Sequence, residues 1–496
     1  MPTPKASLRD TFGSGLDRDD SANVSRIIGR HGSARGILSP SGSTLGRSCG
    51  RSPSEVERPM DGTYERTKSV TFEDDLPHGF PERKASFSRF HFEEDDALAP
   101  LSGFVAVVLS VVFVAAESSR PQSHSSTRRE ITFVRHGQST WNAVGRIQGS
   151  SNFSFLTDKG ESQAEITRGI VAEEEYDACL ASPLRRARQT ADVVWGRRDA
   201  SAIREDRDLR EIDMYAFEGL FKDEGKAKFG DAYDTWKKSP HELVIEGHHP
   251  VRELWDRATS VWERSLSGSG GEQKILVVAH NAMNQALIGS ALGLGPNYFR
   301  RLLQSNCAVS KVVLDENFAP NTGKGIVLEY LNQTPEVPLG QDDSVTLIHC
   351  PSSVEDEAVI TTSVINMLRM IPVRTLMHTK DGSSTRLAGE IIERCKKESS
   401  GECPFAAIAV ESIDESTKVL AETAGFSGST FIVADKSFCQ NFIAQTLVME
   451  SGEMFNLSPG GITVFDMNGG PKKDPVAVCI NHRLYLPAFR RDFNIA

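Results

Sequence analysis

The sequence predicts an α/β fold built on a largely parallel, doubly wound sheet, because short apolar runs alternate with amphipathic helical stretches from residue 130 onward. The expected strands are 131–134, 178–180 and 275–279, and the expected helices are 162–172, 185–195 and 252–266. Two stretches rich in Pro, Gly and Asn, 317–325 and 332–343, interrupt this pattern and indicate a domain boundary, after which the alternation begins again.

Length and composition set the broad class of the protein. The chain has 496 residues, which exceeds one ordinary domain, and its 39% hydrophobic content is sufficient for more than one core. The 56 Lys and Arg against 67 Asp and Glu give a net charge of −11, which argues against a general nucleic-acid binder. The eight cysteines are scattered without a C-x-x-C pair, so we expect reduced thiols and neither a disulfide scaffold nor a structural zinc site.

The region from residue 1 to 97 is predicted to be disordered or to serve in targeting. Ser, Gly and Pro account for 24 of its first 60 residues, and its apolar residues follow no helix or strand period. The segment 68–72 (KSVTF) resembles a short docking motif for a protein phosphatase, and 83–86 (RKAS) resembles a kinase site. Such short patterns recur by chance in polar tails, which is the interpretation that we favour for both.

The segment 98–116 is strongly apolar, and from Phe104 to Ala116 it carries no charge. Three interpretations compete: a membrane span, the hydrophobic region of a targeting peptide with a downstream start such as Met60, and a buried strand. We rank a targeting or membrane-anchoring segment above the buried strand. Residues 117–129, rich in Ser and Arg, then serve as a linker or a transit-peptide remnant.

Charged side chains follow the ends of the predicted strands. Arg135 and His136 come directly after the strand 131–134, and His280 follows the strand 275–279. The carboxyl ends of strands in such a sheet are where ligands bind. Arg186 lies in an arginine-rich helix start, and Glu211 lies in a short apolar segment. Two imidazoles, two guanidinium groups and one carboxyl suit phosphoryl transfer, with a nucleophile, a proton donor and ligands for phosphate oxygens.

These residues stand in motifs that resemble those of the histidine phosphatase superfamily, which has the phosphoglycerate-mutase-like fold. Residues 135–142 (RHGQSTWN) match its signature, and residues 182–191 match its S-x-L-x-R-A-x-x-T-A pattern. The resemblance covers about residues 130–335, the predicted catalytic domain. It implies that His136 becomes a phosphohistidine, that Glu211 is the general acid, and that no metal or cofactor takes part. It further implies phosphate-binding side chains beside the nucleophile: Arg135, Arg186, His280, Ser139, Asn142, Arg146, Gln148 and Asn281.

Longer phrases resemble the plastid 2-carboxy-D-arabinitol-1-phosphatase family, which removes phosphate from a tight-binding sugar-phosphate inhibitor of Rubisco. They include 145–165, 247–258 and 298–310. This resemblance implies a small sugar phosphate as substrate, no nucleic-acid partner and a chloroplast location. His248 and His249 stand where many relatives carry a Gly-Gly-Glu-Ser motif, so they line the substrate-facing wall or lie in a solvated loop.

Three other functions remain open at this point. A phosphoglycerate mutase would share all five catalytic residues, but mutases usually have a longer cover between the acid and the second histidine, which here stand only 69 positions apart. Gln148 also resembles the phosphatase branch, so we favour hydrolysis. A broad phosphatase of phosphoglycerate or phosphoserine is a second alternative. A scaffold that recruits a protein phosphatase through residues 68–72 is the third.

The last part of the chain, residues 344–496 after a linker at 336–343, aligns with the first domain as an internal repeat. We therefore expect the phosphoglycerate-mutase-like sandwich twice, as an active and a degenerate lobe. The repeat keeps apolar positions but lacks the charged ligands, so we expect it to be inactive, with a covering, effector-binding or dimerising role; the oligomeric state is not predicted. The residues at the positions of Arg135, His136, Arg186 and His280 are His349, Cys350, Ser383 and Asp435.

Overall fold

The computed structural model describes residues 128–267, 272–335, 343–351, 354–398, 405–423, 428–467, 474–483 and 486. The predicted disordered region, the motif 68–72 and the apolar segment 98–116 lie outside these residues. We call residues 128–335 the first lobe and residues 343–486 the second lobe. Within the described residues, none of the helices combines the length and the hydrophobicity that a membrane crossing requires.

The first lobe is built on six strands in the order β3-β2-β4-β1-β5-β6. Strands β1 to β4 run parallel to one another, whereas β5 and β6 are antiparallel additions next to β1. This arrangement confirms the predicted α/β class with a largely parallel sheet. The strands are β1 (Arg129–Arg135), β2 (Ala178–Ala181), β3 (Ile203–Glu205), β4 (Lys274–Ala279), β5 (Val309–Ala319) and β6 (Lys324–Gln333).

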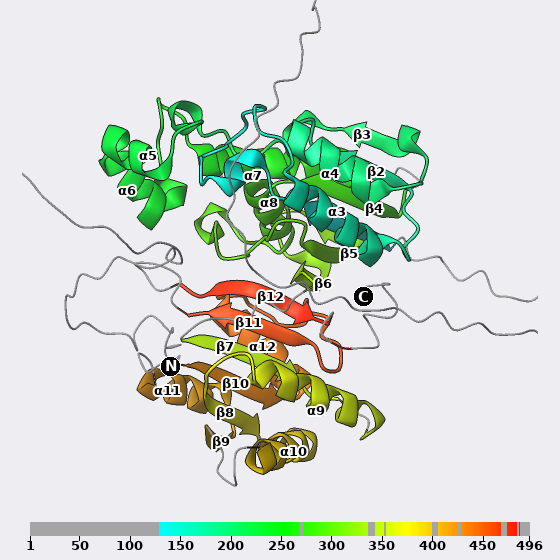
Figure 1. The fold of residues 1–496 in the computed structure, drawn as a ribbon, viewed down its shortest axis with the longest axis vertical. Helices are drawn as coiled ribbons and strands as arrows, with labels where there is room; N and C mark the ends of the chain where they lie inside the picture. The colour runs from blue at the N-terminus through cyan, green and yellow to red at the C-terminus, as the bar shows by residue number, and fades with distance from the viewer. Residues whose placement is uncertain are drawn as a thin grey trace, which may run out of the picture. The chain divides into compact units, whose positions relative to one another are not determined.

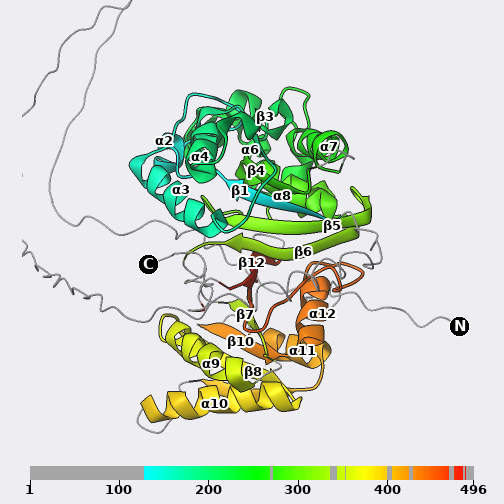
Figure 2. The same cartoon turned by 90° about the vertical axis from the view of Figure 1, so that its right-hand side faces the viewer.

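Helices cover both faces of this sheet, as Figure 2 shows. Alternate residues of β4 explain why, because Leu276 and Val278 pack with α3 and α4, while Ile275 and Val277 pack with α7 and α8. The four covering helices are α3 (Asp158–Val171), α4 (Arg185–Trp195), α7 (Pro250–Val261) and α8 (Asn281–Ala291). The predicted helix 252–266 is an α-helix only to Val261, and a π-helical turn, Trp262–Leu266, continues it. Smaller helices of this lobe are α2 (Thr140–Ala143), α5 (Lys222–Phe229) and α6 (Asp231–Lys238).

The second lobe repeats this strand order in reverse, β12-β11-β7-β10-β8-β9. It is coloured yellow to red in Figure 1. Its strands are β7 (Ser344–His349), β8 (Val373–Thr379), β9 (Ala406–Val410), β10 (Ser429–Ala434), β11 (Ile462–Asp466) and β12 (Val476–His482), and its helices are α9 (Val354–Leu368), α10 (Gly382–Glu398), α11 (Ile413–Thr423) and α12 (Lys436–Thr446).

The two sets of strands belong to one twelve-stranded sheet. The connection is an antiparallel contact between β6 and β12, in which Leu331 is paired with Ile480. A buried apolar cluster continues across this connection, because Leu328 and Leu331 of β6 belong to the same cluster as Ala477 and Ile480 of β12. The pairing leaves neither β6 nor β12 with an open edge at the contact.

Candidate active site

His136 follows the last residue of β1 and is 2% exposed. Its backbone N–H donates to the carbonyl of Ala279 at 3.0 Å, and its Nδ1 lies 2.7 Å from the carbonyl oxygen of Gly137. Since a carbonyl only accepts, Nδ1 carries the proton and Nε2 keeps a free lone pair. Burial, then the guanidinium groups of Arg186 and Arg135, hold the pKa of His136 well below its ordinary value. The imidazole is therefore neutral and nucleophilic at neutral pH.

Two guanidinium groups lie beside this imidazole and are held by backbone carbonyls. Arg135 donates from Nη1 to Gln304 O at 2.7 Å. Arg186 is fully buried and donates to Gly149 O at 2.9 Å and to Ser151 O at 2.8 Å. Burial lowers the pKa of Arg186 to about 10, so the group remains charged at neutral pH. Buried cations of this kind need a negative partner, which suits them to phosphate.

His280 follows β4, and its ring centroid lies 5.1 Å from that of His136. Its Nε2 is 2.8 Å from Ser182 Oγ, which accepts a hydrogen bond from Leu184 N at 3.3 Å. When the hydroxyl of Ser182 donates its proton to Nε2, the imidazole proton lies on Nδ1. Burial, then nearby Arg186, keeps the pKa of His280 well below its ordinary value. The neutral ring can therefore donate from Nδ1 to a ligand oxygen.

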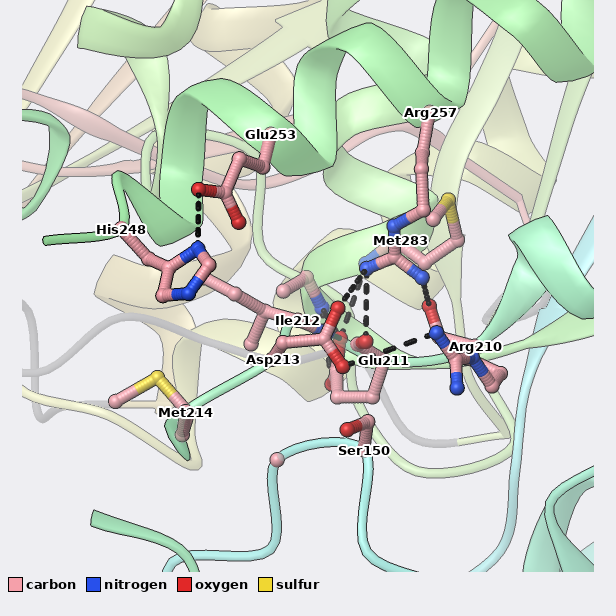
Figure 3. Close-up of polar contacts among 12 residues, drawn as sticks. Ser150, Arg210, Glu211, Ile212, Asp213, Met214, His248, Glu253, Arg257 and Met283 are labelled. Atoms are coloured by element: carbon pink, nitrogen blue, oxygen red, sulfur yellow. Dashed lines mark hydrogen bonds and ion pairs between the residues drawn. The ribbon is translucent and has the colours of Figure 1, made fainter. Parts of the chain in front are cut away.

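The carboxylate of Glu211 lies at the N-terminus of α8. Its Oε1 accepts from the backbone N–H of Ala282 at 3.1 Å and of Met283 at 3.2 Å. The partial positive charge of a helix start favours a carboxylate in this position. Arg257 holds the same segment from the other side, because it donates to the carbonyls of Arg210 at 3.0 Å and Glu211 at 2.9 Å (Figure 3). The carboxyl group is therefore fixed between α7 and α8.

Three buried nitrogen atoms of this cluster lack a hydrogen-bond partner within the described residues. They are Nε of Arg135, Nε of Arg186 and Nδ1 of His280. Unpaired buried donors are costly, and in native structures they commonly mark a place where a ligand or water binds. Among the described residues, no group of three or more His, Cys, Asp or Glu is placed to hold a metal ion.

Three of the predicted secondary ligands form a hydrogen-bonded loop that follows His136. Gln148 Oε1 accepts from Ser139 Oγ at 2.8 Å and from Ser154 Oγ at 2.6 Å. Ser139 caps α2 and forms a reciprocal capping box with Asn142. The structure thus brings Ser139, Asn142 and Gln148 together, where they order the loop between Gly137 and Ser154.

The other two predicted ligands make their polar contacts elsewhere. The guanidinium of Arg146 donates to Gly219 O and lies over the ring of Phe221, 4.1 Å from its centroid. Asn281 Oδ1 accepts from Gln285 Nε2 at 3.0 Å, one turn along α8. Their observed contacts are thus with the surrounding framework.

His248 belongs to a small stack beside the acid-bearing segment. Its ring is stacked on that of Tyr215, with centroids 4.2 Å apart. Its Nδ1 is 3.3 Å from Glu253 Oε1, as Figure 3 shows. Tyr215 Oη donates to the other oxygen of Glu253 at 2.6 Å. His249 is held to the same carboxylate through its backbone N–H. The two histidines, predicted either to line the substrate-facing wall or to lie in a solvated loop, are both exposed beside this aromatic and acidic cluster.

Several residues that support the site were not predicted. Asn306 Nδ2 donates to His136 O at 2.9 Å, Gln304 holds Arg135 through its carbonyl, and Arg257 holds the acid-bearing segment. Glu218 accepts from Ser150 N at 2.7 Å and fixes the loop that bears Gly149. Asn306 and Arg257 lie within phrases that carry the family resemblance, which was their one signal in the sequence. Backbone carbonyls carry no signal of this kind.

Comparison with known proteins identifies relatives of this chain. Residues 131–320 match the family model of the histidine phosphatase superfamily (branch 1). The chain is 48% identical over 264 residues to a "Probable 2-carboxy-D-arabinitol-1-phosphatase" of Arabidopsis thaliana, an alignment that covers 51% of this chain and 53% of the relative. It is 54% identical over 219 residues to the 2-carboxy-D-arabinitol-1-phosphatase of Triticum aestivum, covering 44% and 43%.

The chain thus spans about half the length of these two curated relatives. A third relative, a "Probable phosphoglycerate mutase" of Erwinia tasmaniensis, is 32% identical over 204 residues, which cover 40% of this chain and 91% of the relative. A family model and a nearly full-length relative therefore agree with the motifs and with the fold. The chain belongs to the histidine phosphatase superfamily.

Proposed function

We propose that the protein is a metal-independent phosphomonoesterase that acts through a phosphohistidine on His136. The observation that carries this proposal is the hydrogen bond from His136 Nδ1 to Gly137 O, 2.7 Å, which leaves Nε2 as a neutral nucleophile beside two cations. Arg135, Arg186 and His280 supply the unpaired nitrogen donors for the phosphoryl oxygens.

The reaction has two steps. In the first, which begins with Glu211 protonated, Nε2 of His136 forms a bond to phosphorus, the bond from phosphorus to the leaving oxygen breaks, and the carboxyl group of Glu211 gives that oxygen its proton. In the second, a water oxygen attacks phosphorus, the N–P bond breaks, and Glu211 takes the proton of the water. Inorganic phosphate then leaves, and both side chains return to their initial state.

The proposed substrate is 2-carboxy-D-arabinitol 1-phosphate or a related sugar phosphate. The names of the two relatives at 48% and 54% identity support this substrate class. A plastid location is proposed on the same resemblance. Membrane association through residues 98–116 and protein phosphatase docking through 68–72 remain predictions on residues that the structure does not describe.

A phosphoglycerate mutase is the main alternative, because a relative at 32% identity carries that name. Hydrolysis is favoured by the short segment between Glu211 and His280. The α-helices that the structure describes in this segment are α5, α6 and α7. A broad phosphatase of phosphoglycerates or phosphoserine would use the same two steps. A scaffold would not depend on His136.

The test is phosphate release by the purified full chain in EDTA, with 2-carboxy-D-arabinitol 1-phosphate, 3-phosphoglycerate and phosphoserine compared at equal concentration. We expect fast release from the first substrate and slow release from the others. Equal release from all three would keep the hydrolytic mechanism but remove the substrate. Interconversion of phosphoglycerates after priming with a bisphosphate, without phosphate release, would make the protein a mutase.

A further inference from the structure

The segment 301–306 lies between the short helix Pro296–Tyr298 and strand β5. It is held by hydrogen bonds to the second lobe. Leu303 N donates to Ala477 O at 2.9 Å, and Ala477 N donates to Arg301 O at 2.8 Å. The Arg301 side chain is 8% exposed and donates to Thr446 O at 3.1 Å and to Pro475 O at 3.3 Å. Both the backbone and a buried cation of this segment are therefore held by β12 and by the end of α12.

The same segment holds the phosphate site from the opposite side. Gln304 O accepts the hydrogen bond from Arg135 Nη1 at 2.7 Å, and Asn306 Nδ2 donates to His136 O at 2.9 Å. Directly after it, Cys307 N donates to Arg135 O at 3.1 Å. Residues 301 to 306 thus connect the second lobe to the nucleophile and to one of its arginines within a few residues of chain.

Asn332 of β6 reinforces this connection. Its side chain is fully buried, Oδ1 accepts from Ser305 N at 2.6 Å, and Nδ2 donates to Val478 O of the second lobe at 2.7 Å. One amide group therefore binds the segment and the second lobe at once. Its backbone has φ +57°, a conformation that Asn and Gly tolerate better than other residues.

We propose that the second lobe is a positioning element for the active site, which fixes Arg135 and His136 through residues 301–306 and Asn332. Its catalytic consequence rests on the proposed function of the first lobe. A positioning role requires no reactive side chain in the second lobe. This explains why that lobe can lack the charged residues that the first lobe carries at the positions of Arg135, His136, Arg186 and His280. Displacements of about 1 Å in a catalytic group cost up to about 10²-fold in rate, so a loosened segment has a measurable effect.

The second lobe supplies a matched control in Asn481 of β12. This residue also has a positive φ, +52°, and is 1% exposed. Its Oδ1 accepts from Ser458 N at 3.0 Å and its Nδ2 donates across the lobes to Glu329 O at 2.7 Å. Asn332 and Asn481 thus each bind a backbone N–H of their own lobe and a carbonyl of the other lobe, and Asn481 Nδ2 also donates to Asn456 O at 2.8 Å. Asn481 binds Ser458, whose carbonyl contacts His349 and not an active-site arginine.

The experiment compares Asn332→Gly and Asn481→Gly in the full chain, since glycine removes each amide without straining a positive φ. We expect similar decreases in Tm, a decrease in kcat of about 10-fold for Asn332→Gly with a smaller change in KM, and less than a 2-fold change in kcat for Asn481→Gly. Hydrogen exchange of the amides of residues 301–307 should accelerate in the first variant alone. Equal effects of both variants on kcat, or no effect of Asn332→Gly, would overturn the proposal.

A third variant separates the two bonds of Asn332. Asn332→Asp keeps an oxygen for Ser305 N but cannot donate to Val478 O. We expect it to lose activity as Asn332→Gly does, because the tie to the second lobe is gone, and wild-type kcat in this variant would contradict the proposal. Failure of the wild-type chain to release phosphate from any substrate would instead remove the proposed function. The exchange of residues 301–307 would then still decide whether the second lobe orders this segment.

Discussion

The two lobes place the same backbone around very different side chains. Strand β1 lies between β4 and β5, and β7 lies in the same way between β10 and β11. His136 N donates to Ala279 O at 3.0 Å, and Cys350 N makes the corresponding bond to Ala434 O at 2.9 Å. The scaffold that presents a nucleophile is thus present twice, whereas the imidazole and the guanidinium groups are present in the first lobe.

The second lobe satisfies its helix starts with its own carboxylates. Asp381 accepts from the N–H groups of Ser383 at 3.1 Å and Ser384 at 2.9 Å, and Asp435 accepts from Phe438 N at 3.0 Å. Burial raises the pKa of Cys350 to about 12, so its thiol is neutral at neutral pH. A phosphate ion at this position of the second lobe would lie beside the carboxylates of Asp381 and Asp435 and would find no thiolate nucleophile. An anion site therefore depends on a few side chains and not on the strand arrangement.

The strongest way to test this difference is to remove the residue at each equivalent nucleophile position. We expect His136→Ala to lower kcat for phosphate release by about 10³-fold or more and to abolish acid-labile phosphate incorporation, because no other nitrogen replaces Nε2. Cys350→Ala, its counterpart, should leave both unchanged. Labelled phosphate on His136→Ala, or its loss in Cys350→Ala, would move the nucleophile away from the first lobe.

A second test addresses the carboxyl groups. Glu211→Gln keeps the size of the side chain but cannot transfer a proton, so we expect kcat to fall by about 10²–10³-fold while KM changes little. Asp435→Asn is the matched variant in the second lobe, where an amide oxygen can still cap α12. It should retain kcat within about 2-fold. Steady-state kinetics of both variants decide the point, and a large loss in Asp435→Asn would show that the second lobe takes part in proton transfer.

A third test concerns Arg186, whose counterpart in the second lobe is Ser383. Arg186→Met should lower kcat/KM by about 10²-fold, since one charged ligand of the phosphoryl oxygens is lost. It should also raise the pKa of His136, because this guanidinium is one of the groups that disfavour the imidazolium. The acid limb of the pH–rate profile would then move to higher pH. Ser383→Ala should change neither the rate nor the profile.

The features that the sequence predicted are those set by local patterns. The strand ends at Arg135 and His280 follow from apolar runs that stop abruptly, and the helix 185–195 has its predicted bounds. The family motifs then select Arg186 among neighbouring arginines. The structure brings the five predicted catalytic residues together: His136 and His280 are in ring contact, and the charges of Arg135, Arg186 and Glu211 act on one another.

The parts that were missed depend on contacts between distant segments. Gln304 acts through a backbone carbonyl, and Asn332 acts through a bond to Val478, 146 positions away. The pairing of β6 with β12 was likewise missed, because the residue pattern of an antiparallel strand does not indicate which strand it pairs with. Arg146 is a further example: the resemblance implies a phosphate ligand, and in the structure its guanidinium lies over the rings of Trp141 and Phe221 and donates to Gly219 O. Residue type alone does not separate these environments.

The smallest expected effect is a difference in how pH affects the stability of the two lobes. His136 and His280 have pKa values well below 6.5 because of burial, so between that value and their folded pKa the unfolded chain binds more protons than the folded one. Stability therefore falls as the pH drops below 6.5, by up to about 1.4 kcal/mol per pH unit for each histidine.

The decrease in Tm between pH 7.5 and pH 5.5 should be smaller in His136→Gln than in the wild type. It should shrink less in His349→Gln, whose pKa burial also lowers but to a smaller extent. Equal slopes in both variants and the wild type would mean that these buried imidazoles do not control the acid sensitivity, and that the two lobes differ in chemistry but not in proton linkage.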